Sequence, residues 1–96
     1  MLEIVKRPRA KRDLIGIWRY SFDEWGEAQA DKYLAEVEAG IEKLKHNPKL
    51  GRPREEVRAG YRCLRINEHI VYYVLTPSVI RIVRVLHARQ DPDRHL

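Results

Sequence analysis

Two arginines and two histidines in the C-terminal half of the chain are the side chains best suited to chemistry. Arg62 and Arg84 stand among apolar neighbours in segments that alternate with a period of two. A guanidinium buried without a partner is costly, so each should sit at a margin of the sheet or reach a partner. His69 and His87 are candidate acid–base residues, because imidazole titrates near neutral pH. The candidate internal partners of the arginines are Glu55, Glu56 and Asp91.

Other reaction classes lack their residue patterns in this sequence. No HxxxH or CxxC pair suggests a metal site, and no P-loop, GxGxxG or GxSxG motif suggests phosphate, dinucleotide or acyl chemistry. Cys63 is the single cysteine and alternates inside a strand, so we expect a core residue and not a nucleophile. We therefore expect no cofactor and no metal, and a single thiol suits a reducing compartment, the cytoplasm.

The charge distribution points to an anionic partner. The 96 residues carry 19 Lys and Arg against 14 Asp and Glu, a formal net charge of +5 and a pI near 9.6. Residues 49–96 hold ten basic and five acidic side chains, and nine of the ten basic ones are arginine. Arginine binds carboxylate and phosphate groups through a planar pair of donors. The C-terminal half is thus expected to meet nucleic acid or an acidic protein segment, with a solvated basic surface as the alternative.

The N-terminal half predicts a strand followed by a helical hairpin. Residues 2–6 read as a short strand, and apolar residues at steps of three and four predict a helix over about 9–24 that ends at Gly26. On this stripe, Trp18 and Trp25 are expected in the core. A second helix of similar pattern stops near His46, before Asn47-Pro48, and its Gly40 is expected to allow close packing against the first helix.

After residue 48 the apolar period changes from 3.6 to 2. Strands are predicted over 61–66, 69–75 and 79–87, with a further short strand over 55–57. Along 79–87, strict alternation places Val83, Val85 and His87 on one face and Arg84 and Leu86 on the other. Tyr72 and Tyr73 face opposite ways, so at least one is expected in the core. Residues 88–96 have no periodicity and little apolar content. We therefore expect them to contact a binding partner and not to form part of the hydrophobic core.

These elements predict an α+β fold with the order β-α-α-β-β-β, in a single domain over residues 1–96. The helical hairpin can bury its apolar stripes only on one face of a mainly antiparallel sheet. The other face is then left partly open, as the natural place for a ligand. No apolar run approaches the roughly 20 residues of a membrane span, so no membrane role is expected.

Several segments, taken in order along nearly the whole chain, resemble the ParE-type toxins of the ParE/RelE superfamily. Residues 13–20, DLIGIWRY, resemble the family's D-L-x-x-I-W-x-Y segment, and NPKLGRPR at 47–54 resembles its N-P-x-L-G-R-P-R turn. The strand entry GYR at 60–62, HIVYY at 69–73 and IVRVLH at 82–87 continue the likeness, which closes with Arg89, Asp91-Pro92 and Arg94-His95-Leu96. One departure is Arg7 before Pro8, where the family often has Ser or Thr, and this weakens the cap of the first helix.

The resemblance implies a ParE/RelE fold and the toxin half of a type II toxin–antitoxin module, with growth inhibition, plasmid maintenance or stress response as its setting. It implies a ParD-like antitoxin that forms a hetero-oligomeric complex and contacts operator DNA, so that the toxin meets the operator only indirectly. The implied target is DNA gyrase, trapped on cleaved DNA, which requires no catalytic residue in the toxin. The residues expected to contact target or antitoxin are Arg62, Arg65, Arg81, Arg84, His87, Arg89, Asp91, Arg94 and His95.

The RelE branch of the same superfamily supplies the alternative function, ribosome-dependent cleavage of messenger RNA. Arg62 and Arg84 would hold the phosphate, and His87 or Tyr73 would donate a proton. A lysine-rich patch typical of that branch is missing, since Lys49 is the only lysine after Lys45. The sequence therefore favours an enzyme inhibitor over an enzyme.

Overall fold

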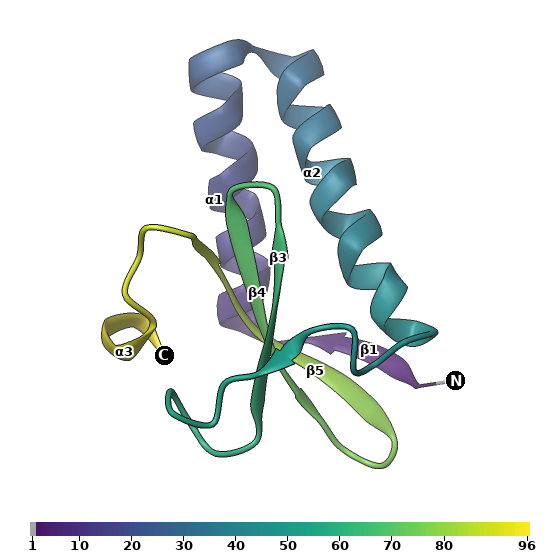
Figure 1. Cartoon of the computed structure of the whole chain (residues 1–96). Helices are drawn as coiled ribbons and strands as arrows, with labels where there is room; N and C mark the ends of the chain where they lie inside the picture. The colour runs from purple at the N-terminus through teal and green to yellow at the C-terminus, as the bar shows by residue number, and fades with distance from the viewer. Residues whose placement is uncertain (1) are drawn as a thin grey trace.

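A helical hairpin and one twisted sheet carry the fold (Figure 1), which a computed structural model describes for residues 2–96. The elements of this part of the chain, in order, are β1 (Glu3–Lys6), α1 (Pro8–Trp25), α2 (Glu27–Glu42), a 3-10 turn (Lys43–Lys45), β2 (Arg52–Pro53), β3 (Tyr61–Ile66), β4 (His69–Leu75), β5 (Val79–His87) and α3 (Pro92–His95).

The strands form one sheet in the order β1-β5-β4-β3-β2. β1 runs parallel to β5, and the other neighbours are antiparallel. This confirms the α+β class and the predicted order of elements. The short strand expected over 55–57 is wrong: β2 lies at Arg52–Pro53, and the following residues turn instead. The turn is closed because the Glu55 carboxylate accepts a hydrogen bond of 2.7 Å from the Gly60 N–H.

The helical hairpin forms where the sequence predicts it. α1 buries Ala10, Leu14 and Ile17 on its apolar stripe. Gly26 closes it with φ 89°, a left-handed value that glycine adopts without steric cost, and α2 begins at the next residue. No helix among residues 2–96 is both long and apolar enough to cross a membrane.

The prediction that both tryptophans lie in the core is wrong. Trp25 is 64% exposed, and Trp18 is half-buried with its indole N–H donating to Asp31 at 2.8 Å. The distal end of the hairpin projects beyond the sheet (Figure 1), so its apolar side chains have no sheet beneath them there. Helical periodicity identifies the apolar stripe of a helix, but it does not show how far along the helix the sheet that packs against this stripe extends.

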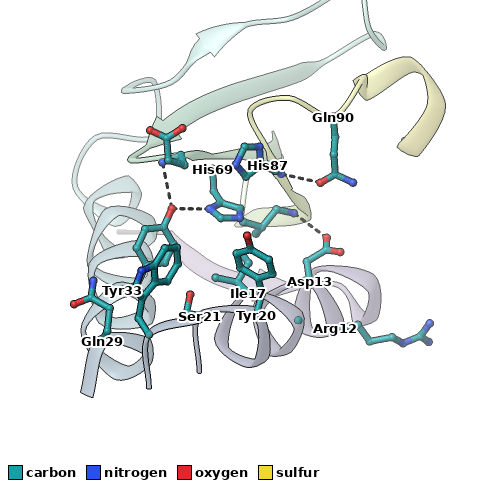
Figure 2. Close-up of a pocket in the computed structure, with 14 residues that line it drawn as sticks. Arg12, Asp13, Ile17, Tyr20, Ser21, Gln29, Tyr33, His69, His87 and Gln90 are labelled. Carbon is teal, nitrogen blue, oxygen red and sulfur yellow. Dashed lines mark hydrogen bonds between the residues drawn. The ribbon is translucent and has the colours of Figure 1, made fainter. Parts of the chain in front are cut away.

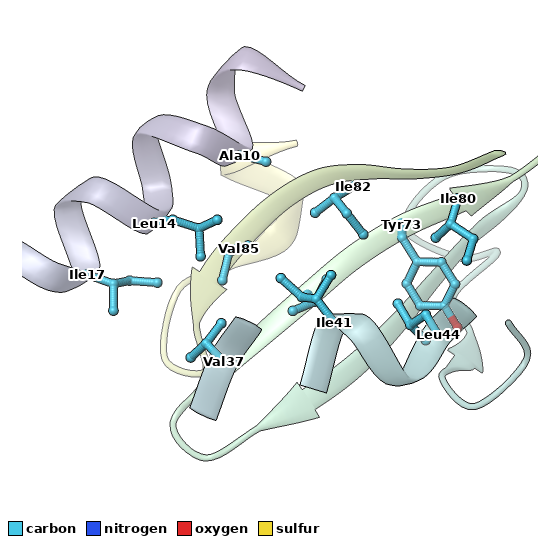
Figure 3. Close-up of a cluster of buried hydrophobic side chains, with 11 residues drawn as sticks. Ala10, Leu14, Ile17, Val37, Ile41, Leu44, Tyr73, Ile80, Ile82 and Val85 are labelled. Atoms are coloured by element: carbon cyan, nitrogen blue, oxygen red, sulfur yellow. The ribbon is translucent and has the colours of Figure 1, made fainter. Parts of the chain in front are cut away.

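The main core lies between the hairpin and the sheet (Figure 3). Val37 and Ile41 of α2 and Leu44 of the 3-10 turn pack against Tyr73 and other buried strand residues. Burying each such aliphatic side chain contributes about 1.5–3 kcal/mol. The Tyr73 hydroxyl donates to the Pro48 carbonyl at 2.8 Å and accepts from the Gly51 N–H at 3.0 Å, so its one polar atom is satisfied.

Gly40 does permit a close approach, but its neighbour is a strand and not the first helix as predicted. A Cβ added at Gly40 would lie 2.3 Å from Cδ1 of Ile66, on β3. The glycine therefore lets α2 settle onto the sheet. A stripe of small and apolar residues does not by itself say which element packs against it.

A β-bulge changes the faces predicted for the last strand. Tyr72 pairs with Arg84 and Tyr73 with Ile82, so Val83 is left without a partner in β4. Strict alternation would place Val85 on the opposite face from Ile82. Because the bulge inverts the alternation after Val83, Val85 instead lies with Ile82 in the core under the helices.

The sheet face away from the helices, which was expected to be partly open, is covered over its middle. Cys63, Tyr72 and Leu86 are buried there, with Leu96 of the C-terminal segment packed on them. The chain end therefore contributes to a small second core, which its low apolar content did not indicate. Tyr72 and Tyr73 are both buried, one in each cluster, so their predicted opposite orientation is confirmed.

Candidate functional site

A pocket of about 500 Å³ opens where the hairpin meets the ends of β4 and β5 (Figure 2). We call it the histidine pocket. Its lining residues are Arg12, Asp13, Gly16, Ile17, Tyr20, Ser21, Trp25, Gln29, Tyr33, Glu68, His69, Val85, His87 and Gln90. The two histidines face each other across the β4–β5 register, which pairs His69 with His87.

Three rings form a polar chain in this pocket. The Tyr33 hydroxyl lies 2.6 Å from Nδ1 of His69 and accepts a 3.2 Å hydrogen bond from the Glu68 N–H. The His69 ring meets Tyr33 and His87 edge-on, with ring centroids 5.4 and 5.3 Å apart. α2 supplies the tyrosine and the hairpin turn between β3 and β4 supplies Glu68, so this chain joins helix to sheet.

Burial favours the neutral form of the His69 imidazole. The Tyr33 hydroxyl accepts from the Glu68 N–H and can donate its own proton to Nδ1 of a neutral His69 ring. Nδ1 of His87 accepts from the Arg89 N–H at 3.1 Å. Burial, and next the nearby His87, lower the pKa of His69 from 6.5 to about 4. Burial also raises the pKa of Tyr33 above its usual 10.0. The His69 ring is therefore uncharged at neutral pH.

Asp13 forms the opposite wall of the pocket and binds the strand directly. Its carboxylate accepts from Nε and Nη2 of Arg84 at 2.7 and 2.9 Å, and from the Val85 N–H at 2.9 Å. β1 pairs with β5 only as far as Ile82, so the carboxylate takes the place of a strand partner beyond it. The Asp13 and Arg84 side chains are only 15% and 11% exposed. This ion pair, 71 residues apart in sequence, fixes α1 to the sheet.

The outer rim of the pocket is aromatic and open to solvent. Tyr20 is 62% and Trp25 64% exposed, and their rings pack edge to face with centroids 6.2 Å apart. Arg12 extends away from the pocket (Figure 2). An apolar rim over a few polar side chains suits the binding of a partner's side chains.

Arg62 forms hydrogen bonds with backbone carbonyls of the protein itself. Its guanidinium donates to the Gly51 carbonyl at 2.6 and 3.1 Å and to the Lys49 carbonyl at 3.2 Å. The acidic partners considered from the sequence are therefore wrong for both arginines, since Arg62 binds carbonyls and Arg84 binds Asp13. Glu56 pairs with Arg54 at 2.5 Å instead.

The remaining predicted contact residues are spread over the surface. Arg65 is exposed and lies 3.6 Å from Glu68, and Arg81 lines a second pocket on β5. Arg89 contributes its N–H to His87, and Asp91 caps α3 by accepting from the Asp93 N–H at 3.0 Å.

The last two predicted contact residues belong to α3. The His95 carbonyl accepts from Arg84, and Arg94 lies in the same turn of helix. The contact roles predicted for these residues remain expectations.

The structure does not bring Arg62, Arg84 and His87 into one pocket. His87 lines the histidine pocket, Arg84 lines a pocket on the other side of β5, and Arg62 holds the 49–51 loop. Among residues 2–96, no group of three or more His, Cys, Asp or Glu side chains is placed to hold a metal ion.

Sequence reasoning missed Asp13 and Tyr33 as parts of the site. Asp13 follows Ala10 by three residues and precedes Ile17 by four, so it sits on the apolar stripe of α1. A carboxylate on a buried helix stripe and an arginine in an apolar strand each carry a desolvation penalty when buried alone. Two such residues in one sequence therefore indicate that the two side chains pair with each other. Tyr33 carried no such signal, because a tyrosine on an apolar stripe is ordinary.

Comparison with known proteins finds similarity over nearly the whole chain. The family model described as the ParE toxin of the type II toxin–antitoxin system parDE matches residues 4–92. Toxin ParE1 of Mycobacterium tuberculosis is 42% identical over 90 residues, which cover 93% of this chain and 92% of that protein. Toxin ParE1 of Caulobacter vibrioides is 43% identical over 88 residues, 92% of this chain and 91% of that protein.

Solved structures share the fold at lower identity. A chain of the chromosomal ParDE system from P. aeruginosa matches with a TM-score of 0.81 at 22% identity, covering 91% of this chain and 96% of that one. YoeB from Staphylococcus aureus matches with a TM-score of 0.63 at 23% identity, covering 90% and 95%.

Proposed function

The chain belongs to the ParE toxins of type II toxin–antitoxin systems, and on that premise we propose that it stops growth in the cytoplasm by inhibiting DNA gyrase and is neutralised by a ParD-like antitoxin. The toxin would hold gyrase on cleaved DNA and perform no bond chemistry itself. The superfamily's other activity, cleavage of messenger RNA, is the function against which the proposal is tested.

The observation that carries the proposal is the internal use of the arginines that a nuclease needs. Nε, Nη1 and Nη2 of Arg84 donate to Asp13 and the His95 carbonyl, and Nε and Nη2 of Arg62 donate to loop carbonyls. Phosphate binding in a transition state requires donors aimed at the reacting group. Arginines already satisfied by the protein itself support an inhibitor that acts through its surface.

Exposed apolar side chains on α1 support the antitoxin part of the proposal. Among residues 2–96, four of the six exposed large apolar residues lie on this helix: Ile15, Tyr20, Phe22 and Trp25. Apolar surface concentrated on one element is typical of a protein–protein interface. An acidic, amphipathic antitoxin segment would bury these side chains and complement the toxin's net charge of +5.

Purified toxin should be assayed in parallel for gyrase supercoiling of plasmid DNA and for messenger RNA cleavage during translation. We expect loss of supercoiling with accumulation of cleaved, protein-linked DNA, and intact messenger RNA. The toxin–antitoxin complex at the same concentration is the control and should leave supercoiling unchanged. Active gyrase together with codon-positioned cuts in the messenger would overturn the proposal.

The antitoxin interface is tested with matched serine variants of two exposed apolar residues. Trp25→Ser on α1 should weaken the complex with the antitoxin, whereas Leu50→Ser, exposed on a loop away from α1, should leave its affinity unchanged. Calorimetry of the two variants measures the difference. Equal affinities for both would refute a role for the α1 surface.

A further inference from the structure

A second pocket, of about 490 Å³, lies on the side of β5 away from the histidine pocket. Four arginines and a tyrosine border it: Arg7 and Arg9 at the start of α1, Arg81 and Arg84 on β5, and Tyr61 on β3. No acidic side chain lines it. We call it the arginine pocket. Pro8, Val74, Val83 and Leu96 supply apolar wall.

Three of the four arginines have no partner for their side chains among the described residues. The charge of Arg84 is balanced by Asp13, but Arg7, Arg9 and Arg81 form no side-chain hydrogen bond or ion pair with any of residues 2–96. The first turn of α1 carries no acidic residue, so it does not offset them. The main-chain oxygen of Leu96, a residue that borders the pocket, accepts from Nη2 of Arg58 at 2.6 Å. The pocket therefore presents about three unbalanced positive charges.

We propose that the arginine pocket binds the phosphodiester backbone of a nucleic acid strand. Arginine binds phosphate through paired donors, and several arginines along one wall match the repeated charge of a strand. The Tyr61 ring at the same pocket gives a nucleobase a surface to stack on. The inference deepens the proposed function, because a toxin that acts on gyrase meets DNA at its target.

Strand pairing at the pocket disfavours an extended acidic peptide as the occupant. Arg81 is paired with Val5 of β1 on one side and Val74 of β4 on the other. β5 has no free edge at this position, so a peptide could not add to the sheet there and would gain only side-chain contacts. A phosphodiester strand needs nothing more than side-chain donors.

Fluorescence anisotropy with the full chain and labelled oligonucleotides tests the proposal without gyrase. Single-stranded DNA, duplex DNA and RNA of one sequence are titrated separately, which distinguishes the source of the phosphate. We expect binding whose log affinity falls with log salt at a slope of about −2 to −3, roughly 0.7 to 0.9 for each of three arginine–phosphate contacts.

Matched variants separate the pocket from overall charge. Arg9→Gln, at an exposed position where folding is insensitive, and Arg81→Gln should each weaken binding about tenfold and reduce the slope by about one. Arg19→Gln removes the same charge ten residues further along α1, about 15 Å away and at another pocket, and should change affinity less than about twofold.

Equal effects of Arg9→Gln and Arg19→Gln would overturn the proposal, because binding would then follow net charge alone. Absence of binding to all three oligonucleotides at low salt would also overturn it. Displacement of DNA by a glutamate-rich peptide of matched charge, at lower concentration than unlabelled DNA, would assign the pocket to an acidic protein segment instead. Because gyrase is absent from these titrations, their result stands apart from the supercoiling assay.

Discussion

Breaking the buried ion pair between Asp13 and Arg84 should cost more stability than any surface change. Asp13→Ala leaves the guanidinium of Arg84, only 11% exposed, without its anion and leaves the Val85 N–H without an acceptor. Removing one partner of a buried pair costs about 3–5 kcal/mol. The slight exposure of this pair favours the lower end, about 3 kcal/mol. Each kcal/mol shifts the melting temperature of a domain of this size by about 4–8 °C, so a fall of about 12–24 °C is expected.

A double-mutant cycle isolates the pair itself. Asp13→Ala combined with Arg84→Met removes both charges, so the double variant should lose about 2 kcal/mol less than the two single variants together. Urea unfolding followed by circular dichroism measures all three. Arg65→Met is the matched control, because Arg65 and Glu68 are 59% and 65% exposed and their pair is worth under about 1 kcal/mol.

Two results would refute this reasoning. A loss below about 1 kcal/mol in Asp13→Ala would mean that water replaces the carboxylate and that the pair is not buried in solution. Additive single and double variants would mean that Asp13 and Arg84 stabilise the fold separately, and that α1 is fixed to β5 by packing alone.

Three further predictions concern pH, close packing and the chain end. The folded-state pKa of His69, about 4, lies below its unfolded value of 6.5, so its contribution to stability is fully present above pH 6.5 and is lost as the pH falls towards 4. Thermal unfolding should show this loss as about 1–2 kcal/mol after allowance for solvent screening, and the loss should be absent in His69→Gln. Gly51→Ala should lower the free energy of unfolding by about 1–3 kcal/mol, because its Cβ would lie 2.5 Å from a backbone oxygen, whereas Gly16→Ala, with open space at that position in a helix, should raise it by up to about 1 kcal/mol. Deleting 88–96 should lower the melting temperature and expose Tyr72 to solvent, detected by near-ultraviolet circular dichroism; an unchanged melting temperature would show that the tail serves contacts alone.

Much of the fold was predictable because it depends on local preferences. A helix that ends at Gly26 follows from glycine's access to positive φ, which the structure shows at 89°. The change of apolar period after Pro48 located β3, β4 and β5, since side chains of a strand alternate between its faces. Resemblance to the ParE toxins added the family, which sequence comparison confirms.

The candidate site was predictable only in its residue types. Arg84 and His87 stood out because charge and titratable rings are unusual in an apolar strand. Their partners were not apparent: Asp13 lies 71 residues from Arg84, and no local rule relates two such positions. Trp25 shows the same limit, since periodicity placed it on an apolar stripe that the sheet does not reach.

By itself, the sequence determined the order of helices and strands, the basic C-terminal half and the family, because these depend on neighbouring residues and on composition. Tertiary structure alone decided which side chains meet. The bulge at Val83 turns Val85 toward the helices, and the β4–β5 register sets His87 beside His69. Both depend on how strands align over long sequence separations, where a shift of one residue exchanges the faces of a strand.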